Sequence, residues 1–155
     1  MRRLIAYLVR FAVILVGYVV GSLAASAFLN ILVLAHLGYT PANPEPTATA
    51  SLYFSVPFVA LFVAYFAFMP AAVVILIAEV LGRRDWLFYA LGGAVIAVVF
   101  LGFAHSVGDA NFDVTATNAR LAVIGCGMVG GIFYWLSAGR WAGSWRRAAL
   151  PDLEA

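Results

Sequence analysis

The stretch Phe11–Leu37, FAVILVGYVVGSLAASAFLNILVLAHL, decides the fold class of this chain. It holds no Asp, Glu, Lys or Arg, and it is longer than the about 20 helical residues that cross the hydrocarbon core of a bilayer. In hydrocarbon every backbone N–H and C=O must find a partner within the segment, and an α-helix provides those partners. The stretch therefore predicts a transmembrane helix.

Three further apolar stretches follow along the chain: Tyr53–Leu81, Trp86–Val107 and Leu121–Ala138. None carries a charge in its central turns, and each has the length of a membrane span. Proline-rich or polar segments separate the first stretch from the second and the third from the fourth. We expect an all-α fold, an integral membrane four-helix bundle that forms one transmembrane domain, with spans at about 11–37, 53–81, 86–107 and 121–138.

The composition agrees with this expectation. Of the 155 residues, 65% are hydrophobic and 10% charged, and the mean hydropathy is +1.02, whereas a soluble domain has about 45–50% apolar and about 25% charged residues. A net charge of +2 is too small to indicate a nucleic-acid-binding protein. The single cysteine, Cys126, excludes an internal disulfide and a cysteine-based zinc cluster.

The arginines predict the orientation. In the four-span arrangement only Arg120 falls on one side of the membrane, and the other side holds Arg2, Arg3, Arg10, Arg83, Arg84, Arg140, Arg146 and Arg147. Because positive charge accumulates on the cytoplasmic side, both termini are expected in the cytoplasm of a bacterial inner membrane.

A cleaved signal peptide is the alternative for the first stretch. The arginine-rich start, the apolar run and Ala25-Ser26-Ala27 fit the pattern of a signal sequence with its cleavage site. The apolar character, however, continues well past that site, which favours a retained helix.

A glycine motif lies in the fourth stretch, where Gly125–Gly130 reads GCGMVG. It matches the dinucleotide fingerprint G-x-G-x-x-G formally, but no strand precedes it and no acidic ribose ligand follows at the required distance. Spacing of small residues by four instead indicates close helix packing in lipid. The expected packing residues, either within one bundle or in a homo-oligomer seam, are Gly17, Gly21, Ala25, Gly127 and Gly131.

Glu79 is the only acidic residue within a span. An ionisable group in a membrane helix suggests a functional role because its burial is costly. Arg83 follows four residues later, so an ion pair near the headgroups is the structural interpretation. A proton or cation relay is the functional one.

His36 and His105 lie at the ends of the first and third stretches, at the same predicted depth. Two such histidines would suit a haem or a metal, with Asp109 as a further ligand. Single histidines are also ordinary at membrane interfaces, and with so few ligands we expect no cofactor.

Asn30 and Arg120 are further polar candidates near the outer side. Arg120 opens the fourth stretch and is expected to pair with Asp109 or Asp113 in the preceding loop, or to meet a ligand. Pro57 and Pro70 each remove a backbone donor from the second stretch, which predicts kinks that neighbouring helices compensate.

One segment, GMVGGIFYWLSAGRWAG (Gly127–Gly143), is similar to the last span of small uncharacterised four-helix inner-membrane proteins of high-GC alphaproteobacteria. The resemblance implies no activity and no site residue. We expect a non-enzymatic accessory or interaction protein whose partners are the lipid bilayer and either further copies of itself or a larger membrane complex. A small transporter or ion-conducting subunit is the second hypothesis, and a haem- or quinone-linked anchor is the third.

Overall fold

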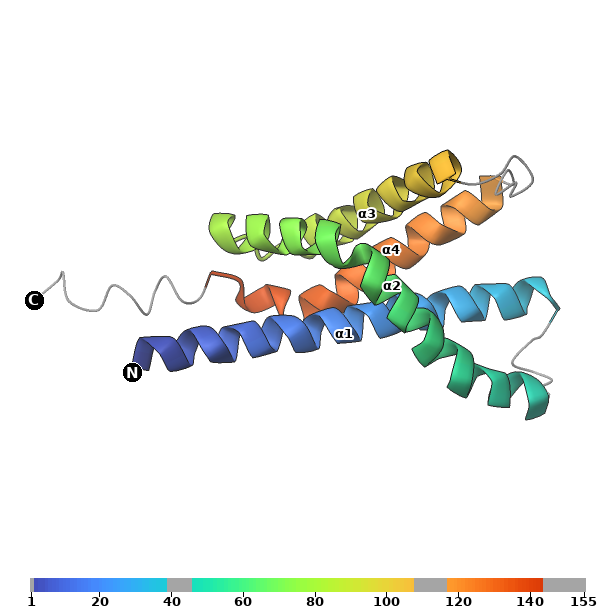
Figure 1. Cartoon of the computed structure of the whole chain (residues 1–155), viewed down its shortest axis with the longest axis horizontal. Coiled ribbons are helices and arrows are strands. Elements are labelled where there is room, and N and C mark those ends of the chain that lie inside the picture. Colours follow the sequence, from blue (N-terminus) through green and yellow to red (C-terminus); the bar gives the residue numbers. More distant parts are fainter. Residues whose placement is uncertain (1, 39–45, 108–116, 144–155) are drawn as a thin grey trace, which may run out of the picture.

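The computed structural model describes residues 2–38, 46–107 and 117–143, and within them the chain is helical without strands. Its helices are α1 (Arg2–His36), α2 (Pro46–Leu81), α3 (Trp86–Val107) and α4 (Thr117–Ser137), and α4 leads into a short 3-10 helix, η1 (Gly139–Trp141) (Figure 1). In this part of the chain four helices are long and apolar enough to cross a membrane. The prediction of a multi-pass, all-helical membrane protein is confirmed.

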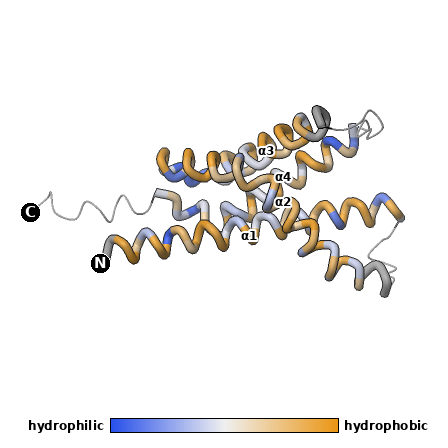
Figure 2. The backbone as a smooth tube through the Cα atoms, in the orientation of Figure 1, coloured by the Kyte–Doolittle hydropathy of each residue, from blue (hydrophilic) through white to orange (hydrophobic). Residues whose placement is uncertain are grey.

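The helices form a bundle in which α4 packs most extensively against α3 and α1. Helix α2 crosses over α1 and reaches α3 with its second half (Figure 1). The start of α1, the end of α2, the start of α3 and η1 lie together, and we call this region the Glu79 end. At the opposite end, the His36 end, α1 and α3 finish and α2 and α4 begin. Hydrophobic residues cover most of each helix between the two ends (Figure 2).

Three helices start earlier than the apolar stretches predict, among them α4, which begins at Thr117 rather than Leu121. Helix α1 begins at Arg2 rather than near Phe11, because arginine is a good helix former and nothing in the first residues breaks the helix. Helix α2 begins at Pro46 rather than Tyr53, and proline is favoured in the first turn, where its missing N–H has no partner to lose. Helix α3 covers the same residues as the predicted span.

Glycines allow α3 and α4 to approach at backbone distance. A Cβ atom on Gly93 would run into the carbonyl oxygen of Gly127, and one on Gly127 would run into that of Gly93. One turn further along α4, Gly131 faces the carbonyl of Tyr89 in the same way. Such close approach is how membrane helices gain packing energy.

A second glycine contact joins α1 to α4. A Cβ atom on Gly21 would lie 2.8 Å from the carbonyl oxygen of Gly130, and one on Gly17 would lie 2.6 Å from the Cβ of Ala138. Ala25 is buried against Gly130. The small-residue stripes of α1 and α4 are therefore used inside one chain, and the GCGMVG motif lies in mid-helix.

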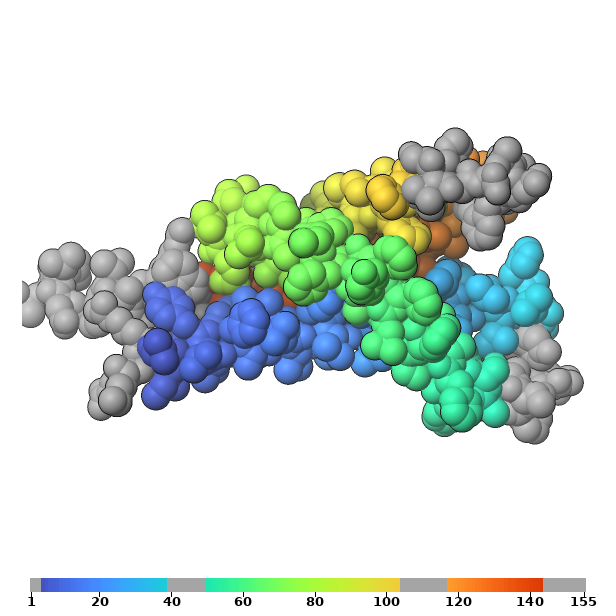
Figure 3. All heavy atoms as spheres, in the orientation of Figure 1, coloured from blue at the N-terminus to red at the C-terminus, as the bar shows by residue number. Residues whose placement is uncertain are grey.

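Polar bonds fasten the first half of α2 to α1. The hydroxyl of Ser26, which has no exposed surface, donates to the carbonyl of Val56 at 2.7 Å, and the Tyr18 hydroxyl donates to the carbonyl of Ala64. Ala25-Ser26-Ala27, the candidate cleavage site, thus lies within a continuous α1 at its contact with α2. The outer side of this part of α2 carries large exposed aromatic residues, and the part projects on the side of α1, away from α3 and α4 (Figure 3).

Candidate functional site

A buried ion pair at the Glu79 end joins three elements. Arg10 of α1 donates to Oε1 of Glu79 in α2 through Nε, at 3.0 Å, and through Nη2. The second carboxylate oxygen, Oε2, accepts the backbone N–H of Gly143, just after η1, at 3.1 Å. Arg10 also donates to the carbonyl of Ala138 at 3.3 Å. We call these four residues the Glu79 cluster.

Two glycines with left-handed backbones shape this cluster. Gly82 ends α2 with φ +65°, and the N–H of Arg83 returns to the carbonyl of Ala78, which is the Schellman pattern. Gly143 has φ +67°, and a Cβ atom there would lie 3.0 Å from the Cα of Gly82. Both positions need glycine's access to positive φ, and the absence of a side chain at Gly143 lets it lie against the backbone of Gly82. This contact brings the Gly143 N–H to Glu79.

The turn between α2 and α3 is tied to the same region by a second set of bonds. Arg84 donates through Nε to the carbonyl of Ala142 at 3.0 Å. The indole N–H of Trp135 donates to the carbonyl of Arg84 at 2.6 Å, and the Tyr89 hydroxyl donates to the carbonyl of Arg83 at 3.2 Å. The segment after α4 is therefore held against both ends of the α2–α3 turn.

The expected pairing of Glu79 with Arg83 is wrong. Arg83 lies beyond the left-handed Gly82, so it no longer continues the helical face of Glu79. It lies 3.5 Å from Asp85 in an exposed pair, whereas the partner of Glu79 is Arg10. From the sequence alone, Arg10 is predicted only to set the orientation in the membrane.

The chemistry of the Glu79 cluster suits a structural role. The side chains of Arg10 and Glu79 are only 12% and 11% exposed, and a buried charge needs both a counter-charge and hydrogen bonds. Both oxygens of Glu79 are used, one by the guanidinium and one by a main-chain N–H. Without this carboxylate the Arg10 charge would be buried without a counter-charge. The same carboxylate thus links α1, α2 and the residues after η1.

The other polar candidates are not brought to this cluster. Asn30 of α1 lies where this helix contacts the first part of α2. Its Oδ1 accepts from the Ser55 hydroxyl at 2.7 Å, and its Nδ2 donates to the carbonyl of Ser26 at 2.9 Å. Arg120 is exposed in the first turn of α4, at the His36 end. Its expected partners Asp109 and Asp113 lie outside the described residues. Glu79, Asn30 and Arg120 therefore do not form one site.

The two histidines are both at the His36 end. His36 is the exposed last residue of α1. His105 belongs to the last turn of α3, but its side chain lies outside the described part, as does Asp109. Among the residues described, no group of three His, Cys, Asp or Glu side chains lies close enough together to hold a metal ion.

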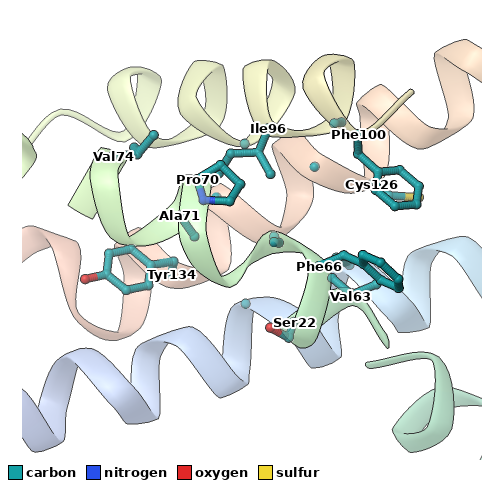
Figure 4. A pocket seen from close by; sticks show the side chains of 18 of the residues that line it. Ser22, Val63, Phe66, Pro70, Ala71, Val74, Ile96, Phe100, Cys126 and Tyr134 are labelled. Carbon is teal, nitrogen blue, oxygen red and sulfur yellow. The ribbon is translucent and has the colours of Figure 1, made fainter. Parts of the chain in front are cut away.

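A large apolar cavity lies in the middle of the bundle. Its volume is about 810 Å³, and residues of all four helices line it (Figure 4). The lining holds no Asp, Glu, Lys, Arg or His. Cys126, the single cysteine, is buried in its wall. This cavity is not predicted from the sequence; Pro70 of α2 and small residues of α3 such as Gly93 and Ala97 contribute to its lining.

Comparison of the chain with protein-family models, with curated proteins and with solved structures finds no match in any of the three.

Proposed function

We propose that this chain is a non-catalytic, multi-pass protein of a bacterial inner membrane that serves as an interaction subunit for another membrane protein. The observation that carries this proposal is the stretch of α2 from Tyr53 to Tyr65, whose outer side is aromatic and exposed. Tyr53, Phe54 and Tyr65 are 78%, 81% and 80% exposed, and hydrogen bonds to Ser55, Val56 and Ala64 hold this stretch to α1.

Exposure alone does not indicate a partner here, because lipid tails solvate apolar side chains as well as protein does. The kind of side chain is more informative. Aromatic residues are enriched where proteins bind one another, and on α2 exposed aromatic residues outside the lining of the cavity recur at Tyr53, Phe54, Phe58 and Tyr65. Side chains as exposed as Tyr53, Phe54 and Tyr65 contribute little to the packing that holds a membrane bundle together. A partner helix would give them packing contacts.

The absence of catalysis in this proposal is supported by the use of the charged groups. The buried pair, Arg10 and Glu79, is fully engaged in bonds that hold η1 and α1 to α2. The buried hydroxyl of Ser26 is likewise bonded to a carbonyl.

Site-specific photocrosslinking tests the interaction. Benzoyl-phenylalanine replaces Phe54 or Tyr65 on α2, and as matched controls it replaces Val16 on α1 or Val95 on α3, which are also exposed. Irradiation of intact cells should give a discrete protein adduct from the two α2 positions and none from the controls. Adducts of equal yield at all four positions, or no protein adduct at any, would contradict the proposal.

We also propose that the Glu79 end faces the cytoplasm. Arg10, Arg83, Arg84 and Arg140 lie at that end, and Arg120 lies at the other, which fits the accumulation of positive charge on the cytoplasmic side. The indole side chains of Trp86, Trp135 and Trp141 are placed at the same end, as is usual for an interface.

Cysteine accessibility tests this orientation. In a Cys126→Ser background, cysteine is placed either at position 85 or at position 118, both exposed and at opposite ends of the bundle. A membrane-impermeant maleimide should label intact spheroplasts only through position 118, and inverted vesicles only through position 85. The reverse pattern would overturn the orientation while leaving the four-helix fold intact.

A further inference from the structure

The cavity is closed to polar ligands by its chemistry. Three of the four hydroxyl groups in its lining donate to the protein: Ser22 to the carbonyl of Tyr18 at 2.9 Å, Tyr18 to that of Ala64, and Tyr89 to that of Arg83. Cys126 is buried and behaves as a small hydrophobic residue. An apolar space of this kind stays dry and takes up apolar molecules.

Tyr134 closes the cavity toward the Glu79 end. Its side chain is 6% exposed, and within the described part of the chain its hydroxyl has no hydrogen-bond partner. That hydroxyl points away from the other labelled side chains of the cavity (Figure 4). The Tyr134 ring therefore contributes carbon atoms to the wall of the cavity, and its hydroxyl does not determine which molecule binds there.

The cavity meets the lipid-facing surface between α2 and α3. Lining residues on these two helices are also substantially exposed: Met69 is 75% and Phe103 66% exposed, and Phe62, Phe66 and Phe100 share this position at the rim. Helix α2 packs more sparsely against α3 than α3 does against α4. The opening therefore faces the hydrocarbon of the bilayer and not water.

The cavity is large enough for a hydrocarbon chain. The volume of about 810 Å³ lies within the range of about 300–1,000 Å³ that small-molecule sites occupy. Along α4 the lining runs from Val123 to Tyr134, about 16 Å at about 1.5 Å per residue, and along α2 it runs from Val59 to Ile75, about 24 Å. Each leaflet contributes about half of the about 30 Å hydrocarbon core, so the cavity is at least as long as an acyl chain is deep in one leaflet.

We propose that this cavity binds one acyl chain of a bilayer lipid, which enters laterally between α2 and α3. Bilayer lipid surrounds the opening at very high concentration, so even weak affinity gives occupancy by mass action. An isoprenoid tail or a helix from a second copy of the chain would meet the same apolar lining, and the experiment below separates these occupants from an acyl chain.

The test uses the full chain in vesicles of phosphatidylethanolamine and phosphatidylglycerol that contain a small fraction of phosphatidylcholine with a diazirine in mid-chain. After irradiation, peptide mapping should find lipid on Ile96 and Cys126, which line the cavity and lie behind the lipid-facing surface. Val63→Trp fills the cavity from α2 and should lower this labelling several-fold. The matched control Val73→Trp, at an exposed position of α2 outside the lining, should leave it unchanged.

A second pair guards against a variant that fails to fold. Ile96→Trp fills the cavity from α3, and Val95→Trp is its exposed neighbour outside the lining, with Cys126 then the mapped position. If neither filling variant folds, the map of the unmodified chain still decides. Label confined to outward residues such as Val95, or label at Cys126 that persists when the cavity is filled, would overturn the proposal. So would preferential labelling by a photoactivatable isoprenoid quinone at the same mole fraction, or crosslinks from Cys126 to a second copy of the chain.

Discussion

Removing either partner of the Arg10–Glu79 pair should destabilise the bundle strongly. Both side chains are about nine-tenths buried, and loss of one member of a buried pair costs about 3–5 kcal/mol because the other charge remains buried and uncompensated. Glu79→Gln keeps an oxygen that can accept the Gly143 N–H, so its cost isolates the unpaired charge of Arg10. We expect this loss in the free energy of unfolding, measured by titration with sodium dodecyl sulfate in mixed micelles.

Replacing both partners should be far less harmful. In the double variant Arg10→Met/Glu79→Met no charge is buried, and an apolar replacement of an ion pair ranges from neutral to stabilising. Against this stands the loss of the bonds to Ala138 and Gly143, at about 1 kcal/mol each. The double variant should therefore lie within about 2 kcal/mol of the unmodified chain.

The matched control is the exposed pair of Arg83 and Asp85, whose side chains are 55% and 67% exposed at 3.5 Å. Asp85→Asn should cost less than about 1 kcal/mol. The reasoning is refuted if Glu79→Gln is as stable as this control. If Glu79→Gln in addition changed proton or cation flux into proteoliposomes, Glu79 would act as a proton or cation relay, as the transporter hypothesis requires, and its role would not be only structural.

Three further changes test the packing. Gly93→Leu forces a side chain into the α4 backbone, so it should lower the free energy of unfolding by more than the about 1–3 kcal/mol of ordinary overpacking. Gly102→Leu is the control and should be tolerated in the same unfolding assay, because a Cβ atom there meets no atom within 4 Å. Ser26→Ala removes a fully buried donor to an α2 carbonyl and should cost about 1–3 kcal/mol, and an unchanged unfolding midpoint would show that this bond adds nothing. Trp135→Phe removes the hydrogen bond from the indole N–H to the α2–α3 turn and should lower the free energy of unfolding by about 1 kcal/mol. Proteolysis of the chain after η1 should also become faster. Unchanged proteolysis would mean that this hydrogen bond does not hold the residues after α4 in place.

The helices could be predicted from the sequence because every membrane span must bury about 20 consecutive apolar residues in lipid. Hydrophobic length alone predicts Trp86–Val107 as a helix, and α3 has these bounds. The same criterion places the start of α1 too late, since hydropathy reports what lies in hydrocarbon while helical structure continues through Arg2–Arg10. Residues Pro46–Leu52 in α2 were likewise too polar for the apolar criterion.

The polar contacts were harder to predict, since their partners are distant in sequence. Arg10 and Glu79 are separated by 69 positions, and local spacing favours Arg83 instead. One local feature did argue against Arg83: Gly82 directly after an apolar run is typical of a helix C-cap, and it removes Arg83 from the face of Glu79. The cavity has no sequence pattern of its own, because it depends on how far α2 stands from α3.

The position of Gly143 in the chain has a consequence for biogenesis. Arg10 and Glu79 leave the ribosome with the first and second helices, so their charges can meet as soon as that helical hairpin is inserted. The N–H of Gly143 and the carbonyl of Ala138 become available only after α4 has been synthesised. Until then the pair lacks two of its hydrogen bonds, so the inserted hairpin should be less stable than the same two helices in the finished bundle. Synthesis of the residues after α4 should complete the Glu79 cluster.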